Sequence, residues 1–149
     1  TIKTGASTLG IRESRRFSGK YVMNISDLRE ARRFPDVVVH KAQFVVDIHN
    51  PVGGGQANGI AEYVDAYDIP WRSLVPQKME NLILAGRCIS GTHEAMASYR
   101  VMAIAMAIGE AAGIGAALAI DHNVTPENLD VKYIQKALMD KGAVLFDEK

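Results

Sequence analysis

Short apolar runs, rich in β-branched and aromatic side chains, follow one another through the first half of the chain. They predict strands or extended segments at 17–25, 37–39, 44–48 and 60–69, because such side chains favour pleated, half-buried backbone. Asn50–Pro51 and three consecutive glycines separate the last two runs and predict a loop. The first half is therefore expected to be rich in β structure.

A short helix is predicted between the first two runs. Asp27, with Glu30 three residues later, resembles the start of a capping box. Pro35 should end this helix, because the residue before a proline disfavours helical backbone.

The second half carries a strand-then-helix pattern. Residues 82–85 (LILA) are apolar throughout, as expected for a buried parallel strand. A run rich in alanine and glycine follows a polar loop and predicts a long helix that begins within 98–101 and ends near Ile120. A last helix is predicted from its N-cap Asp130 to Gly142. Its apolar stripe consists of Val131, Ile134, Ala137 and Leu138.

The stretch from Val101 to Ile120 is about as long as a membrane span. It contains Glu110 and three glycines, and it lacks the basic and aromatic residues that flank membrane helices. A buried core helix is therefore the favoured interpretation, and no membrane partner is expected.

Composition narrows the class of protein. The chain has 149 residues, of which 48% are apolar, so it is one ordinary domain or a piece of something larger, and disorder is excluded as its main state. Lys+Arg and Asp+Glu both number 17, so no excess positive charge points to nucleic acid. A single cysteine excludes an internal disulfide framework. The chain opens at Thr1 without a leader pattern, so a cytoplasmic protein is the default expectation.

The unit formed by the 82–85 strand, the polar loop and the long helix is the leading candidate for chemistry. Arg87 follows the strand, where open α/β sheets bind ligands, and Arg100 stands at the start of the helix. The unpaired N–H groups of a helix N-terminus favour a phosphate or an electron-rich ring oxygen. The alternative is a plain packing unit whose arginines are solvated or ion-paired.

Two histidines are the candidate catalytic groups. His93 lies in the polar loop between the two arginines, and His49 follows an apolar run. An ordinary surface or core role is the alternative for both. The spacing of the histidines fits no zinc motif, so no metal site is expected.

Three arginines near the N-terminus could clamp an acidic substrate, or simply form a solvated face. They are Arg12, Arg15 and Arg16. Cys88, beside Arg87, is a reactive thiol or, more simply, a buried structural one. The glycine-rich stretch 53–59 matches neither dinucleotide nor Walker motifs and predicts a flexible loop.

The strand–loop–helix stretch at 82–120 resembles the C-terminal flavin-binding segment of FAD-dependent oxidoreductases with the glutathione-reductase-like fold. The string that carries the resemblance, NLILAGRCISGTHEAMASYRVMAIAMAIGEAAGIGAALA, begins at Asn81 and ends at Ala119. Residues 10–24, 67–76 and 131–145 also resemble a bacterial family of these enzymes, some of whose members carry the name xanthan lyase. No Tyr/His/Arg arrangement typical of a polysaccharide lyase is evident, so that name is not adopted as a function.

This resemblance implies an α/β protein: the C-terminal part of a FAD/NAD(P)-binding Rossmann-like fold with part of a β-rich substrate domain. The chain itself would be an α+β fragment of that protein, divided into three regions. Residues 1–76 would belong to the substrate-binding domain, 77–120 would be the last strand and helix of the FAD-binding domain, and 121–149 would form a helical tail.

The resemblance also implies roles for individual residues. Gly86 would let the backbone approach FAD, and Arg87 stands where related flavoproteins have an acidic residue, so it is a candidate for the pyrophosphate. Arg100 would lie at the helix start. The remaining implied FAD contacts are Cys88, Ile89 and the first-turn backbone of Val101, Met102 and Ala103. His93 would lie near the flavin or the substrate.

These implications define two hypotheses. In the first, the chain is the C-terminal fragment of a FAD-dependent oxidoreductase acting on a small molecule, in one version a carbohydrate-related one; alone it would be inactive without the N-terminal dinucleotide-binding half, which carries the G-x-G-x-x-G motif. In the second, it is a non-enzymatic, degenerate flavoprotein module that binds itself as a homo-oligomer or binds another chain.

Overall fold

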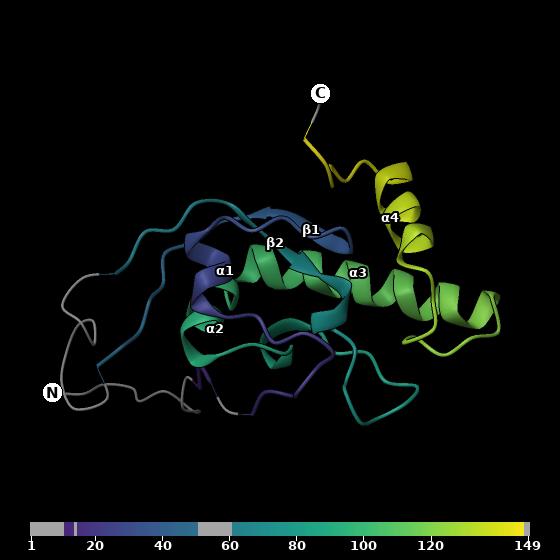
Figure 1. Cartoon of the computed structure of the whole chain (residues 1–149), viewed down its shortest axis with the longest axis horizontal. Coiled ribbons are helices and arrows are strands. Elements are labelled where there is room, and N and C mark those ends of the chain that lie inside the picture. Colours follow the sequence, from purple (N-terminus) through teal and green to yellow (C-terminus); the bar gives the residue numbers. More distant parts are fainter. Residues whose placement is uncertain (1–10, 14, 51–60, 148–149) are drawn as a thin grey trace, which may run out of the picture.

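The computed structural model describes residues 11–13, 15–50 and 61–147, and it shows a mixed α/β arrangement of helices around a small sheet (Figure 1). The predicted loop at 53–59 lies outside the described residues. The elements in chain order are α1 (Ile25–Arg29), β1 (Val37–Ala42), β2 (Tyr67–Pro70), the 3₁₀ turns η1 (Trp71–Ser73) and η2 (Gly86–Cys88), α2 (His93–Tyr99), α3 (Met102–Asp121) and α4 (Val131–Asp140).

A complete capping box opens α1. The side chain of Asn24 accepts from the amides of Ser26 and Asp27, and the Asp27 carboxylate accepts from the Asn24 amide. The predicted box was therefore placed three residues too late: Asp27 closes the box and does not begin it. The helix ends before Pro35, as predicted.

The sheet consists of β1 and β2, which pair antiparallel with Val37 opposite Pro70 and Val39 opposite Ile69. The predicted strand at 37–39 is confirmed and continues to Ala42. Of the predicted extended run at 60–69 only its end forms a strand, and Pro70 is the last residue of that strand. The register is irregular at two points.

Three predicted strands are wrong for the residues that the structure describes. The runs at 17–25 and 44–48 contribute only isolated bridges, Gly19 to Pro76, Met23 to Gly91 and Val46 to Glu62. The backbone of the first run pairs with a different segment every few residues, and the second run makes one bridge within the described residues, so neither forms a ladder. The 82–85 segment is extended but makes one backbone bond, from the Leu84 amide to the Leu74 carbonyl at 2.8 Å. A buried parallel strand needs a ladder of backbone bonds along its edges, and among the described residues this single bond does not make one.

The predicted long helix is α3, which begins at Met102, one residue after the predicted range, and the stretch predicted as a polar loop before it contains a further helix, α2. α2 ends at Tyr99, and Val101 takes extended backbone (φ −72°, ψ 153°) before α3 begins. The predicted C-terminal end of the long helix is confirmed to within one residue. α4 also forms as predicted, with the Asp130 side chain accepting from the Lys132 amide and Gly142 at φ +93° beyond its end.

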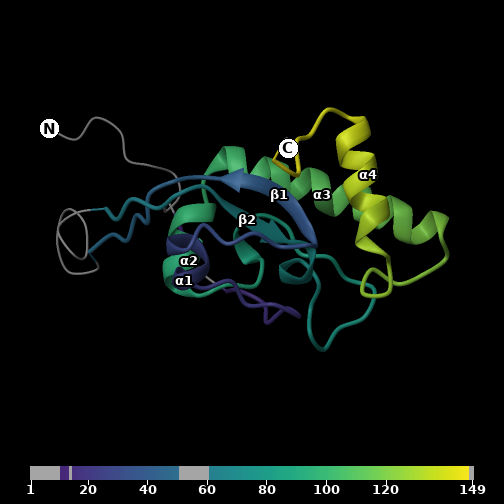
Figure 2. The same ribbon diagram turned by 45° about the horizontal axis from the view of Figure 1, so that its top comes forward.

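α3 is the central element of the fold. β1 packs along it, α4 crosses it near its C-terminal end, and α1 and α2 lie at the opposite end (Figures 1 and 2). Gly115 faces the Trp71 ring so closely that an added Cβ would collide with it. A single cluster of buried apolar side chains joins β1, β2, α2, α3 and α4.

Within the described residues α3 is also the one helix whose length and mean hydropathy (1.9) would allow it to cross a membrane. This is weak evidence, because the core helix of a soluble protein meets the same criterion. The sequence-based expectation of no membrane partner stays a prediction.

Candidate functional site: a basic cavity beside the Gly86 turn

The candidate site begins with a turn that only glycine adopts easily. Gly86 has φ +65°, a left-handed conformation that other residues reach only with strain, and an added Cβ would meet nothing within 4 Å. The turn places Arg87 and Cys88 on η2 directly after the extended segment 82–85. Open space over a bare backbone suits the close approach of a ligand, which is the role that the resemblance implies for Gly86.

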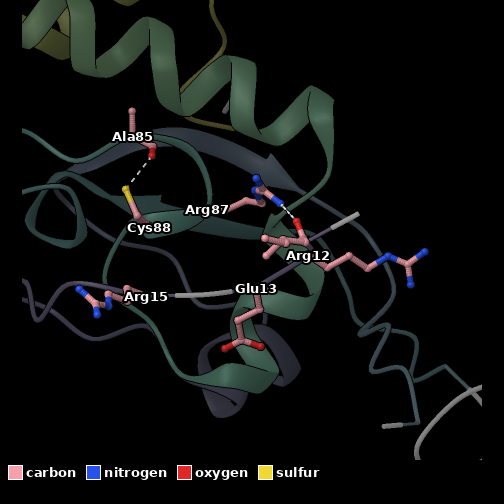
Figure 3. Close-up of a pocket in the computed structure, with 7 residues that line it drawn as sticks. Arg12, Glu13, Arg15, Ala85, Arg87 and Cys88 are labelled. Atoms are coloured by element: carbon pink, nitrogen blue, oxygen red, sulfur yellow. Dashed lines mark hydrogen bonds between the residues drawn. The ribbon is translucent and has the colours of Figure 1, made fainter. Parts of the chain in front are cut away.

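The segment from Ile11 to Phe17, which carries the three N-terminal arginines, lies against this turn. The Phe17 amide donates to the Cys88 carbonyl at 3.1 Å, and the Arg87 guanidinium donates to the Ile11 carbonyl. Together the two segments enclose a cavity of about 230 Å³ (Figure 3). Its lining consists of Ile11, Arg12, Glu13, Arg15, Ala85, Arg87 and Cys88.

Positive charge dominates this cavity. Three of its lining residues are arginines, and its one carboxylate, Glu13, is already paired with Arg16 and with His93 Nδ1. Among the described residues neither Arg12 nor Arg15 has an ion-pair partner. The cavity can therefore accept an anionic group, such as a phosphate or a carboxylate.

The predicted arginine clamp is brought together only in part. Arg12 and Arg15 line the cavity, but their guanidinium groups extend toward opposite sides in Figure 3. Arg16 is engaged by Glu13. The structure instead adds Arg87, from a segment more than 70 residues away, to the two N-terminal arginines.

Cys88 and His93 differ in their exposure and in their hydrogen bonds at this site. The Cys88 thiol is half-buried and donates to the Ala85 carbonyl at 3.1 Å. His93 is the first residue of α2, and half of its side chain is exposed. Its neighbour Glu94 has a lowered pKa, first because its own backbone amide donates to its carboxylate and then because the Thr92 side chain does so.

Ile89 is fully buried, so its side chain packs in the core. Any contact of Ile89 with a cofactor would have to use its backbone. The Tyr99 hydroxyl lies 3.5 Å from the Ile89 carbonyl, and burial strongly raises the pKa of Tyr99.

A second polar cluster forms at the junction of α2 and α3. Arg100 donates to the Asp47 carbonyl at 2.6 Å and lies 3.3 Å from its carboxylate, and the same carboxylate is 3.0 Å from His49 Nε2. Asp47 therefore brings together two residues that the sequence had placed in separate roles. Met102 and Ala103, in the first turn of α3, are exposed next to this cluster, while Val101 is half-buried.

Sequence reasoning missed the two carboxylates that organise these clusters. Glu13 lies within the run of arginines, and Asp47 interrupts the apolar run FVVDI. A lone acidic residue inside either pattern was the available signal. No group of three metal-ligating side chains lies together in the part of the chain that the structure describes.

The sequence model of the family described as FAD dependent oxidoreductase matches residues 1–138. The chain belongs to the FAD-dependent oxidoreductase family. This confirms the family that the 82–120 string predicted, and it implies FAD as the cofactor. No curated protein and no solved structure matches the chain.

The residues present fit one portion of FAD. A cavity of about 230 Å³ is smaller than the roughly 300–1,000 Å³ of typical small-molecule sites, so it could hold a phosphate or a ring edge but not a whole dinucleotide. The arginine-rich lining and the open space at Gly86 suit a phosphate group or a ring edge of FAD. The other FAD contacts of a complete enzyme have to come from outside this cavity.

Proposed function

We propose that the chain acts as the C-terminal part of a FAD-dependent oxidoreductase, supplying contacts to the flavin side of FAD and part of the substrate site. The observation that carries this proposal is the Gly86 turn, which places Arg87 in one cavity with Arg12 and Arg15, two arginines without an ion-pair partner in the described part of the chain. Family membership makes FAD the cofactor to test at this cavity. The finer assignment to xanthan lyase-named members has no further support.

Two surfaces of the fold support an additional dinucleotide-binding half that would cover them. The 82–85 segment is apolar and extended, yet it lacks strand partners among the described residues. One face of α3 is exposed and apolar along its whole length, at spacings of four and three residues. That face consists of Met102, Met106, Gly109, Gly113, Ala116 and Ile120. A dinucleotide-binding sheet would pair with the segment and cover this face.

FAD, when bound, would supply the hydride or electron chemistry of the proposed enzyme. The part of this chain is to bind and to orient. The first-turn amides of α3 would donate to the flavin pyrimidine oxygen, and Arg87 would bind an anionic group of FAD. Arg12 and Arg15 would hold an acidic small molecule, for which a carbohydrate-related compound is one candidate.

His93 and His49 would transfer protons to or from the substrate. Glu13 engages His93 Nδ1, so Nε2 is the atom of His93 through which a proton could pass to or from the substrate. His49 is held by Asp47 beside Arg100, which is the corresponding arrangement at the second cluster. We propose His93 as the catalytic group at the cavity and His49 as a second candidate.

The exposed face of α3 also supports a second candidate function, a non-enzymatic module that self-associates. In that case two copies would cover this face for each other, and the chain would form a defined oligomer without binding flavin. Size measurement of the purified chain separates the two candidates when combined with flavin binding.

The decisive experiment mixes FAD with the chain alone, and with the chain joined to a dinucleotide-binding half of the same family, and removes unbound FAD by gel filtration. The proposal expects a retained visible flavin spectrum only for the joined protein. Retention by the chain alone would show a self-sufficient flavin module. A flavin-free oligomer in both samples would favour the non-enzymatic module.

A further inference from the structure

A buried histidine–aspartate pair lies in the sheet, away from the candidate site. His40 on β1 and Asp68 on β2 expose only 3% and 2% of their side chains, and His40 Nδ1 is 2.8 Å from Asp68 Oδ1. Asp68 also accepts from an Arg33 guanidinium nitrogen at 3.0 Å and from the Phe34 amide at 3.3 Å. An ionised carboxylate can only accept, so Nδ1 is the donor, and the proton of a neutral His40 ring lies on Nδ1.

The other ring nitrogen of His40 is left without a hydrogen bond. His40 Nε2 is buried and unpartnered, and the Asp147 carboxylate lies 3.6 Å from it. In the neutral ring Nε2 carries a lone pair, so two acceptors would face each other. In the protonated ring Nε2 carries a hydrogen and can donate to Asp147, which converts an unsatisfied buried atom into a charge-assisted bond.

Asp147 belongs to a C-terminal segment that lies back over the sheet. The segment 143–147 is anchored by Leu145, which is 3% exposed, and Asp147 also pairs with Lys41. Arg33 also lies near this group, with its Nε 4.0 Å from the Asp147 carboxylate. The bond from Lys41 is the main reason that the pKa of Asp147 is lowered, so this carboxylate stays ionised in mildly acidic solution.

We propose that His40 is a proton-dependent clasp that holds the segment 143–147 against the sheet. The charged groups that face the ring are Asp68 from β2, Asp147 from the segment, Arg33 from the stretch after α1, and Lys41 beside it on β1. The ring contacts the two carboxylates, and the two cations bind those same carboxylates from outside.

The sign of the pH dependence follows from this arrangement. A docked segment stabilises the charged ring, so docking is strongest when His40 is protonated and weakens as the pH rises and the ring becomes neutral. Lys41 and Arg33 keep part of the attraction at high pH. The clasp therefore loosens the segment when the ring loses its proton, whether or not the chain binds FAD.

The test follows the Leu145 methyl groups by NMR in the full chain at pH 5.5 and pH 8.0. Their position between docked and random-coil shifts gives the ratio of docked to free segment. We expect that ratio to be about tenfold higher at pH 5.5, as for gaining one hydrogen bond to a charged group. The Ile134 methyl groups, buried in α4, report any global unfolding.

Variants separate the clasp from a general effect of pH. Asp147→Asn, at an exposed position, and His40→Gln should each make the Leu145 ratio independent of pH, whereas Asp140→Asn removes an exposed α4 ion pair with Lys136 and should leave the pH dependence intact. An unchanged ratio in the wild-type chain, or a pH dependence that survives Asp147→Asn, would overturn the proposal. If His40→Gln does not fold, Asp147→Asn decides.

Discussion

The Trp71 ring packs against the bare backbone of Gly115, at the point where η1 meets the middle of α3. Trp71 is 4% exposed, and its indole nitrogen donates to the Pro126 carbonyl at 3.3 Å, so the ring has little freedom to move. The contact joins the sheet layer to the central helix. It also makes Gly115 different from its neighbour Gly113, which faces open space.

Alanine at the two glycines should therefore change stability in opposite directions. Gly115→Ala should lower the free energy of unfolding by about 1–3 kcal/mol, because the added methyl group collides with a fixed ring. Gly113→Ala should raise it by up to about 1 kcal/mol, because alanine is the better helix former. Urea unfolding of the chain measures both. Equal effects of the two substitutions would contradict the packing described for Trp71.

Removal of the Arg87 guanidinium should weaken flavin retention in the joined protein. We expect Arg87→Ala to lower the FAD affinity by about tenfold or more, because a charge-assisted contact to an anionic group is lost. Arg29→Ala is the matched control, since Arg29 forms an exposed ion pair with Glu62 elsewhere on the surface. Titration of flavin fluorescence measures both variants. Equal affinities for the two variants would remove Arg87 from the cofactor site.

His93→Gln should reduce turnover while flavin content stays the same. The substitution keeps a polar side chain near Glu13 but removes the imidazole ring that would transfer the proton. Loss of general acid–base help corresponds to roughly a 100-fold or greater fall in kcat. A fall in flavin content with normal turnover per bound flavin would instead make His93 a cofactor contact.

Alkaline pH should destabilise the fold through Tyr67. Burial raises the pKa of Tyr67 to about 12, while its ordinary value is 10.0, and its hydroxyl lies 2.8 Å from Ser98 Oγ. The unfolded chain ionises first, so stability is complete below pH 10 and falls by about 2–3 kcal/mol as the pH rises through 12.

Tyr67→Phe should flatten this part of the pH profile, since no proton is left to lose. Tyr63→Phe is the control, because Tyr63 is 86% exposed and should not affect the profile. Thermal unfolding at pH 9, 10 and 11 measures the slope for each protein. A profile that Tyr67→Phe leaves unchanged would show that another group, such as buried Tyr99, causes the loss.

Local signals in the sequence predicted the parts of this fold that depend on local energetics. α4 formed between its predicted N-cap Asp130 and Gly142, because a capping side chain and a glycine act within one turn. The 82–85 strand did not form, because a strand needs partners and its apolar pattern carries no information on whether they are present. α2 was also missed, because its residues were assigned to the polar loop that precedes the long helix.

The sequence predicted which residues lie at the candidate site better than it predicted which of them pair with one another. Arg12, Arg15, Arg87 and Cys88 do line one cavity, although the sequence had divided them between substrate and cofactor. Glu13 and Asp47 were missed, because the value of a carboxylate lies in the distant residues that it pairs with. Such pairings depend on tertiary contacts across more than 50 positions, which no local pattern records.

The extended backbone of Val101 has a consequence for how this chain can recognise a ligand. A continuous helix from His93 to Asp121 would have a single positively polarised end, at His93. The interruption gives the same stretch of sequence a second such end, next to Arg100 and on a helix of 20 residues. Because Val101 leaves the helical conformation, this stretch has two helix N-termini that attract anions instead of one. The N-terminus of α2 lies near the basic cavity, and that of α3 lies near Asp47.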